Sequence, residues 1–137
     1  MERKEPPAMS PSRILVADDD STIRRFIVTL LSDRGYEILE AADGEQAYKV
    51  AEHAKPDLML LDLIMPFRDG FDVLQDLKRS PETASIPVII MSVKDREEEI
   101  VKGLSMGADD YVVKPFNSLE LVARVRKVLE RESRQAE

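Results

Sequence analysis

Residues 56–66 read PDLMLLDLIMP, a short apolar run that follows a proline and stops at an aspartate, Asp62. Three other apolar runs have the same form, because a polar residue follows each of them directly. They are Ile14–Ala17 before Asp18, Val88–Met91 before Ser92, and Tyr111–Val113 before Lys114. The runs are continuous rather than alternating, which is typical of strands in a parallel sheet with helices on both faces.

Segments with helical periodicity separate these strands. After the first strand, apolar residues recur at i, i+3, i+4, i+7 and i+8, and Gly35 follows them at a helix C-cap position. The first expected helix is Ile23–Leu31, with Phe26 in its apolar stripe; the second is capped by Asp43 and broken by Pro56, and the third is Gly70–Arg79. We expect a fourth helix, Asp95–Gly107, to bury Ile100, Val101 and Leu104. A last helix from about Asn117 should bury Leu121, Val122, Val125, Val128 and Leu129.

With a further strand at Tyr36–Ala41, five strands alternate with five helices. This alternation predicts an α/β fold with a parallel sheet. Because crossover connections are right-handed, few windings are available to such a chain. We therefore expect a doubly wound five-stranded parallel sheet of order 2-1-3-4-5.

Length and composition predict one domain. The chain has 137 residues, which is enough to enclose a single core. We expect residues 1–12 (MERKEPPAMSPS) to be a disordered lead-in, residues 13–131 to form the domain, and residues 132–137 to form a polar C-terminal tail.

Charge and composition exclude several classes of function. The net charge of −7 argues against direct binding to nucleic acid or to an anionic membrane surface, and it is compatible with binding a cation. The chain has no cysteine, so disulfides and thiolate metal sites are excluded. No apolar run is long enough to span a membrane, and no signal peptide opens the chain. We expect a cytoplasmic protein.

The residues that end the strands carry the candidate chemistry. In an open parallel sheet, ligands bind at the carboxyl ends of the strands, near the point where strand order reverses. Asp18, Asp19, Asp62, Ser92 and Lys114 all fall at that edge. Three close carboxylates favour a hard divalent cation, and Mg²⁺ suits this set of oxygen ligands. A carboxylate held near Mg²⁺, an ammonium group and a hydroxyl is suited to attack phosphorus and form an aspartyl phosphate.

Each of these residues also has a simpler interpretation. Acidic residues in loops often cap helices, and Asp20 or Ser21 is suited to cap the first helix. A single aspartate after a strand is often a turn residue, and so is a lysine before proline. The functional interpretation is favoured because four separate strand ends carry the residue types that one reaction needs.

The motifs ILVADDDSTIRR, PDLMLLDLIMPFRDGFDVL, IPVIIMSVKD and GADDYVVKPF resemble, in order and spacing, those of the response-regulator receiver domain of two-component signalling. The resemblance covers about residues 13–131 and implies the flavodoxin-like receiver fold. It implies that Asp62 is the phospho-acceptor and that Asp18, Asp19, Asp62 and the backbone carbonyl of Ile64 bind Mg²⁺.

The same resemblance assigns the remaining positions of the site. Ser92 and Lys114 would contact the phosphoryl group, and Ser92 and Tyr111 would form the switch pair. The Lys114–Pro115 peptide bond would be cis. Val93 stands where the family usually has a smaller residue, so we expect it to crowd access of phosphate or the movement of Tyr111.

Two other positions beside the site are unusual or variable. Phe67 replaces a residue that is often small and adds exposed apolar surface. Ile64 and Lys94 occupy the variable positions that tune the lifetime of the phosphate in this family.

The resemblance implies a phosphorylation-activated switch rather than a turnover enzyme. A sensor histidine kinase or phosphotransfer protein would phosphorylate Asp62. The face built from the fourth helix, fifth strand and fifth helix would then change its preference for a downstream partner or for an output domain that these residues do not include. That face would also support a homodimer, in which acidic residues such as Asp109 and Asp110 pair with basic ones such as Arg124.

Two other functions remain open at this point. One is a Mg²⁺-dependent phosphatase or phosphotransferase with an aspartyl-phosphate intermediate, although such enzymes commonly have a second aspartate where this chain has Ile64. The other is a pseudo-receiver that binds partners without taking phosphate. The full set of Asp18, Asp19, Asp62, Ser92 and Lys114 argues against the second.

Overall fold

The computed structural model describes residues 11–136, so most of the predicted N-terminal lead-in, 1–12, lies outside the described residues. Within residues 11–136, five strands alternate with five helices, as the sequence predicts. The elements are β1 (Arg13–Ala17), α1 (Ser21–Ser32), β2 (Glu37–Ala41), α2 (Gly44–Ala54), β3 (Leu58–Asp62), α3 (Gly70–Arg79), β4 (Val88–Ser92), α4 (Glu97–Ser105), β5 (Asp110–Val113) and α5 (Ser118–Ala136).

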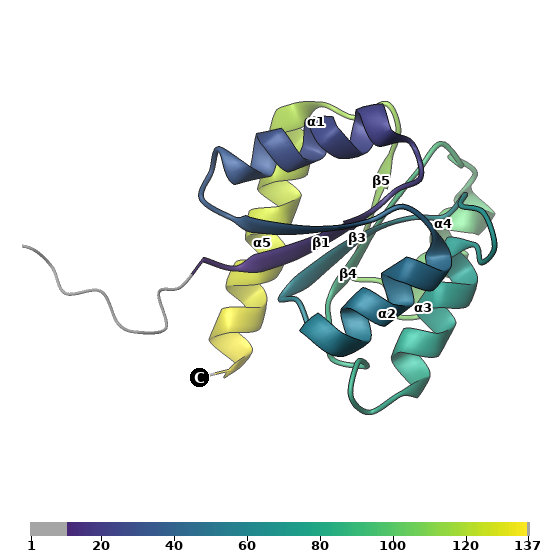
Figure 1. Ribbon diagram of the computed structural model, residues 1–137. Helices are drawn as coiled ribbons and strands as arrows, with labels where there is room; N and C mark the ends of the chain where they lie inside the picture. The colour runs from purple at the N-terminus through teal and green to yellow at the C-terminus, as the bar shows by residue number, and fades with distance from the viewer. Residues whose placement is uncertain (1–10, 137) are drawn as a thin grey trace, which may run out of the picture.

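The strands form one parallel sheet of order β2-β1-β3-β4-β5, which confirms the predicted topology. Figure 1 shows the three layers: α1 and α5 cover one face of the sheet, and α2, α3 and α4 cover the other. Two apolar clusters separate along the same division. One contains Ile27 and Leu31 of α1 with Leu121 of α5, and the other contains Ala47 of α2 with Leu74 of α3.

The central strand β3 is apolar at each of the four positions before Asp62, because both of its faces are covered. Leu58 and Leu60 pack into the cluster under α1 and α5, whereas Met59 and Leu61 pack into the cluster under α2 and α3. All four side chains are fully buried, because the pleat sends alternate residues to opposite faces and both faces are covered. The strand can therefore hold Asp62 at its carboxyl end against a rigid core.

Helix starts follow the predicted capping pattern. The Asp20 carboxylate accepts hydrogen bonds from two backbone amides of α1, and the Asp43 carboxylate accepts one from the Gln46 amide of α2, as predicted. Asp69 caps α3. At the end of α1 the C-cap is Asp33 rather than Gly35, and Gly35 follows with a φ of 92°, the left-handed geometry of a tight turn.

The prediction that α4 buries Val101 and Leu104 is wrong. These side chains are 51% and 43% exposed, and the residue of α4 that is fully enclosed is Gly103. A methyl group on Gly103 would lie 2.6 Å from Ile90 and 3.4 Å from the Tyr111 ring, so α4 packs on the sheet through this glycine. The inward face thus contains Ile100 and Gly103, and the next positions around the helix point outward.

Phe26 of α1 belongs to the predicted apolar stripe but is 50% exposed, because it lies at the edge of the stripe. At the other end of the chain, α5 continues to Ala136, so the polar residues after 131 extend a helix. The boundary of the domain at residue 131 stays a prediction.

Among the described residues, no helix combines the length and the apolar character that crossing a membrane requires.

Candidate functional site

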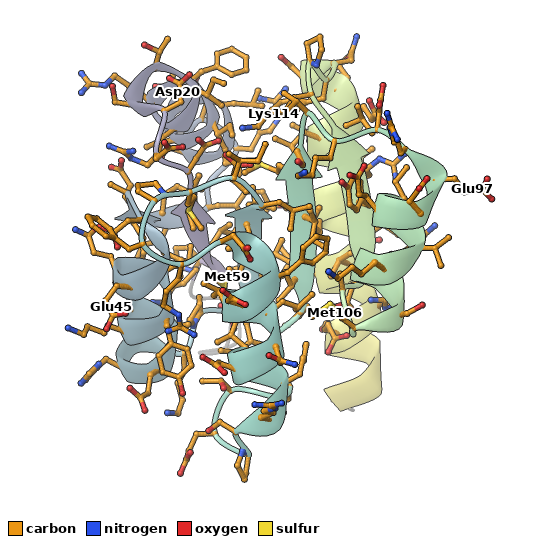
Figure 2. All side chains as sticks on the ribbon, turned by 90° about the vertical axis from the view of Figure 1, so that its right-hand side faces the viewer. Asp20, Glu45, Met59, Glu97, Met106 and Lys114 are labelled. Carbon is orange, nitrogen blue, oxygen red and sulfur yellow. The ribbon has the colours of Figure 1, made fainter. Side chains whose placement is uncertain are left out.

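Asp18, Asp19, Asp62, Ser92 and Lys114 lie together at the carboxyl edge of the sheet, as the sequence predicts. Asp62 and Ser92 are the last residues of β3 and β4. Asp18 and Asp19 are the first two residues after β1, and Lys114 is the first after β5. Strands β1, β3, β4 and β5 are neighbours in that order, which brings their ends together. Figure 2 shows Asp20 and Lys114 at this upper edge, above Met59 in the core.

The three aspartates form a compact group of oxygen atoms. One carboxylate oxygen from each of Asp18, Asp19 and Asp62 lies within 4.8 Å of the others. Asp18 is fully buried and Asp62 is 5% exposed, whereas Asp19 faces solvent. A cation could therefore reach the group from the side of Asp19, and its charge would offset the repulsion between buried carboxylates.

Two hydrogen bonds orient Asp18, one through its side chain and one through its backbone. Its carboxylate accepts a hydrogen bond from the backbone amide of Asp20 at 2.9 Å, and its backbone carbonyl accepts one from the Arg24 guanidinium at 2.6 Å. Arg24 also pairs with Glu40 of β2 at 3.0 Å. Arg24 was not predicted as a residue of the site. Its position one helical turn after the Asp20 cap is the signal that its side chain could turn back toward Asp18.

Lys114 bridges two of the aspartates. Its ammonium group lies 2.7 Å from an oxygen of Asp18 and 3.3 Å from an oxygen of Asp62, and its side chain is 9% exposed. Burial disfavours the charged ammonium, but the hydrogen bond to Asp18 and the charges of both aspartates outweigh it and raise the pKa of Lys114. The Lys114–Pro115 peptide bond is cis, as predicted.

Asp62 is held in an unfavourable environment for a negative charge. Burial is the largest cause, and it raises the pKa of Asp62 to about 6 together with the charge of Asp18, against the opposing effects of Lys114 and the Ile64 amide. That amide donates to Asp62 Oδ1 at 3.2 Å. Without a cation, the ionised carboxylate of Asp62 thus destabilises the folded protein near neutral pH.

Asp62→Asn is expected to raise the free energy of unfolding by about 3 kcal/mol at pH 7 in EDTA, since each unit of pKa difference corresponds to about 1.4 kcal/mol. The folded pKa of about 6 lies above the ordinary value of 3.8, so the destabilisation is absent below pH 3.8 and complete above about pH 6. Urea unfolding of both proteins, followed by far-UV circular dichroism from pH 3.5 to 7.5, measures the difference.

The matched control for this prediction is Asp95→Asn, which removes one carboxylate at an exposed loop position. Its effect on stability should stay within about 0.5 kcal/mol at every pH. A stability difference between wild type and Asp62→Asn that does not change between pH 4 and 7 would contradict the raised pKa of Asp62.

Ser92 and Tyr111 meet at the backbone of Lys94. The Ser92 hydroxyl is fully buried and accepts a hydrogen bond from the Lys94 amide at 3.1 Å. The Tyr111 hydroxyl donates to the Lys94 carbonyl at 2.7 Å, and its ring is 7% exposed, so it lies inward. Val93, between them in sequence, is 58% exposed.

Two hollows are lined by residues that contact or adjoin the acidic group. One, of about 500 Å³, is lined by Ile23, Phe26, Val93, Lys114 and Phe116 among others. Another, of about 540 Å³, lies between the β3–α3 loop and α4.

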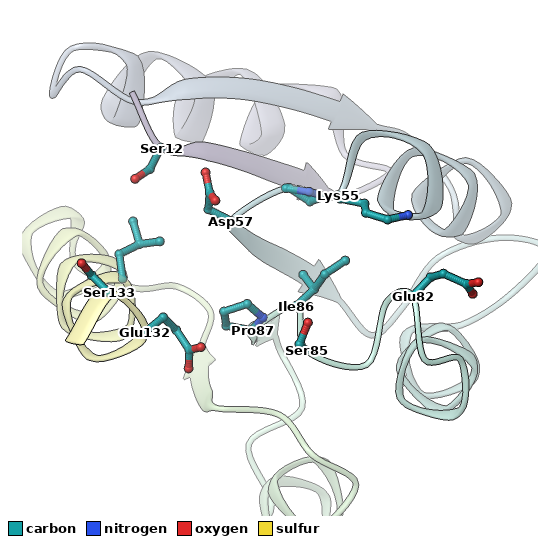
Figure 3. A pocket seen from close by; sticks show the side chains of 11 residues that line it. Ser12, Lys55, Asp57, Glu82, Ser85, Ile86, Pro87, Glu132 and Ser133 are labelled. Carbon is teal, nitrogen blue, oxygen red and sulfur yellow. The ribbon is translucent and has the colours of Figure 1, made fainter. Parts of the chain in front are cut away.

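A third hollow, of about 440 Å³, lies at the opposite edge of the sheet (Figure 3). Ser12, Asp57 and Pro87, which line it, precede β1, β3 and β4, so it faces the amino ends of the strands. It contains none of the predicted site residues. We therefore place the candidate site at the carboxyl edge, where the oxygen ligands and Lys114 converge.

Comparison with known proteins assigns nearly all of the folded chain to one family. A family model described as the response regulator receiver domain matches residues 14–126. Among curated relatives, a phosphate regulon transcriptional regulatory protein, PhoB, of Pseudomonas aeruginosa is 45% identical over 118 residues, which cover 86% of this chain and 52% of the relative. A probable transcriptional regulator, ycf27, of Porphyridium aerugineum is 43% identical over 123 residues, covering 90% and 50%. The chain thus spans about half the length of these relatives.

Solved structures show the same fold. The receiver domain of a Francisella response regulator is 36% identical, with a TM-score of 0.84, over 88% of this chain and 98% of that one. A CheY-like receiver domain protein from Methanospirillum hungatei is 27% identical, with a TM-score of 0.86, over 92% and 99%.

Proposed function

The chain belongs to the response-regulator receiver family, and from that premise we propose that Asp62 accepts a phosphoryl group from a sensor histidine kinase or a phosphotransfer protein. The observation that carries the proposal is the bridge of Lys114 between Asp18 and Asp62, beside the group of three carboxylates. A buried lysine in this position can neutralise charge on the oxygens of a phosphoryl group attached to Asp62.

The same residues fit Mg²⁺. The group offers only oxygen ligands, and two of its three carboxylates are buried with Lys114 as their only ammonium partner among the described residues. Asp18, Asp19, Asp62 and the backbone carbonyl of Ile64 would hold the ion. When bound, Mg²⁺ supplies positive charge that offsets the negative charge of the transferring phosphoryl group.

The transfer itself needs little from the protein beyond position and charge. A carboxylate oxygen of Asp62 forms a bond to phosphorus as the bond from phosphorus to the donor histidine nitrogen breaks. The nitrogen leaves with the electron pair and takes up a proton from solvent. Lys114 stays protonated throughout, because its raised pKa keeps the ammonium charged at neutral pH.

Ser92 and Tyr111 form the proposed switch. When the Ser92 hydroxyl turns to donate to the phosphoryl group, its hydrogen bond from the Lys94 amide is lost, and the loop that also holds Tyr111 can shift. Lys94 thus connects Ser92 to Tyr111 of β5 through its amide and its carbonyl. The phosphate need only favour one of two nearby states of this loop to change the outer face.

The outer face of α4, β5 and α5 is the proposed contact surface for a partner or for a second copy. Val101 and Leu104 of α4 are exposed on it. Asp110 pairs with Arg124 at 2.8 Å within the same chain, so a homodimer through this face must share or exchange that ion pair.

The output and the location belong to the same proposal. The matched relatives are about twice as long, and one of them is described as a DNA-binding transcriptional regulator. We therefore propose that the receiver controls a separate output domain or partner and does not itself bind nucleic acid, which fits its net charge of −7. We also propose a switch in the cytoplasm rather than a turnover enzyme, since Ile64 offers no acid or base beside Asp62.

Intact-mass measurement after incubation with acetyl phosphate tests the acceptor. In the presence of Mg²⁺ we expect a gain of one phosphoryl group, which disappears when Mg²⁺ is omitted. Asp62→Asn should show no gain, because an amide oxygen is not a nucleophile of comparable strength. No gain by the wild-type protein under any condition would overturn the proposal and favour an interaction module that does not take phosphate.

A further inference from the structure

The β3–α3 loop, residues 63–69, carries Ile64 and joins Asp62 to α3. The loop contains a tight turn in which the Arg68 amide donates to the Pro66 carbonyl at 2.8 Å. The residue at the centre of that turn, Phe67, has a φ of 70° and is 87% exposed. A bulky residue with positive φ is strained, and no burial of its ring compensates for the strain. Something else must hold the loop in this shape.

Arg68 makes the contacts that hold it. The guanidinium pairs closely with Asp76 of α3 and lies 3.9 Å from Glu45 of α2. It also lies over the Tyr48 ring, 5.4 Å from the ring centre. The side chain is 23% exposed, so these partners enclose most of it. One residue of the loop therefore ties it to two helices.

The backbone at Arg68 is packed as closely as its side chain. A methyl group on Gly44, the first residue of α2, would overlap the Arg68 carbonyl and lie 2.8 Å from its Cβ. The base of the loop is closed by a hydrogen bond from the Gly70 amide to the Leu63 carbonyl at 2.8 Å. Between these two fixed points, Ile64 is half-exposed. Its amide donates to Asp62 Oδ1 at 3.2 Å, and we infer that the direction of its carbonyl follows the rest of the loop.

We propose that Arg68 is a positioning residue for the cation site: it fixes the strained loop so that the Ile64 carbonyl is presented beside Asp62. This inference rests on the proposed function, which makes the Ile64 carbonyl a ligand. Residues that orient metal ligands without touching the metal commonly change metal affinity by about tenfold or more when they are replaced. Arg68 contacts none of Asp18, Asp19 and Asp62 in the described structure, so it would act on the cation site through the shape of the loop.

The sign of the effect separates this role from simple electrostatics. Arg68 is a cation, and removing a cation near a divalent ion should tighten binding of that ion. If Arg68 positions the loop, its removal should instead weaken binding, because the loop can relax at Phe67. The two explanations therefore predict opposite changes in the dissociation constant for Mg²⁺.

Isothermal titration of the unphosphorylated protein with Mg²⁺ measures that constant without any activity. For Arg68→Ala we expect a dissociation constant about tenfold larger than for wild type. Tyr48→Leu changes no charge and keeps an apolar side chain in place, and we expect an increase of about threefold from the loss of the cation–π contact. Arg79→Ala, at an exposed position at the end of α3, removes the same charge and should leave the constant within about twofold.

Arg68→Lys gives a further test, because a purely electrostatic role predicts no change in the dissociation constant for Mg²⁺. The lysine keeps the charge but cannot contact Asp76, Glu45 and Tyr48 with one planar group, so binding should stay weakened. Arg68→Ala and Tyr48→Leu proteins that bind Mg²⁺ as tightly as wild type, or more tightly, would overturn the inference. If the wild-type protein itself does not bind Mg²⁺, the proposed function fails, and this inference fails with it.

Discussion

Lys114→Ala is expected to slow phosphorylation of Asp62 by acetyl phosphate by a factor of about 100 or more, even at saturating Mg²⁺. Removing one preorganised group that neutralises developing charge typically lowers a rate by about 10²–10³. Lys114 is the candidate for such a group, because its ammonium lies between Asp18 and Asp62 and is almost fully buried. Initial rates from quenched intact-mass time courses measure the change, since the chain has no tryptophan for fluorescence.

The same substitution should strengthen binding of Mg²⁺. Lys114 occupies oxygens of two of the carboxylates that the ion would use, so its removal takes away a competing cation. Tighter Mg²⁺ binding combined with slower transfer cannot arise from unfolding, which would weaken both. Lys127→Ala, an exposed substitution on α5, removes one charge and should alter neither quantity by more than about twofold. A Lys114→Ala protein with a wild-type rate would show that the lysine has no part in the transfer.

The fold was predictable because the signals for it are repeated along the chain. Each buried strand is a continuous apolar run that ends at a polar residue, and Asp20 and Asp43 mark the starts of the helices after the first two strands. In a parallel sheet, the same end of every strand reaches the same edge. The residues Asp62, Ser92 and Lys114 could therefore be placed together before any distance was known.

The parts that were wrong or missed depend on how helices lie against the sheet. The apolar pattern of α4 predicted burial of Val101 and Leu104, but Gly103 lets the helix approach through a different face. A glycine contributes nothing to an apolar stripe, so the pattern alone points to the wrong side. Contacts such as Arg68 with Asp76 join residues whose partners are set by side-chain direction, which no periodicity encodes.

The roles of individual site residues are a separate matter from their placement. The structure brings Asp18, Asp19 and Asp62 within reach of one ion, and it places Ile64 at the start of the loop beside them. The role of the Ile64 carbonyl as a Mg²⁺ ligand stays a prediction from family resemblance. So does the switch formed by Ser92 and Tyr111. Val93 is 58% exposed and lines the same hollow as Lys114, so the expected crowding by its side chain stays a prediction.

Gly70→Ala is expected to lower the free energy of unfolding by about 3 kcal/mol or more, because inserting an atom into a close-packed site forces backbone shifts. Gly70 is the first residue of α3 and its amide closes the β3–α3 loop on the Leu63 carbonyl. A methyl group on Gly70 would overlap the backbone carbonyl of Asp62 and lie 2.7 Å from the Cα of Leu63. Both obstacles are backbone atoms, so no side chain can turn away to make room.

Gly35→Ala is the matched control. Gly35 has a φ of 92°, and apart from its chain neighbours no described residue has an atom within 4 Å of an added methyl group. It should lose only about 1 kcal/mol, the conformational cost of a left-handed alanine. Urea unfolding followed by circular dichroism compares the two variants, and intact mass with acetyl phosphate and Mg²⁺ reports on the site. Because relief of the overlap must move Asp62 or Leu63, Gly70→Ala should also slow phosphorylation, whereas Gly35→Ala should not. Equal losses of stability in the two variants would mean that α3 can move away from β3 freely, and the loop would then not hold Asp62 in place.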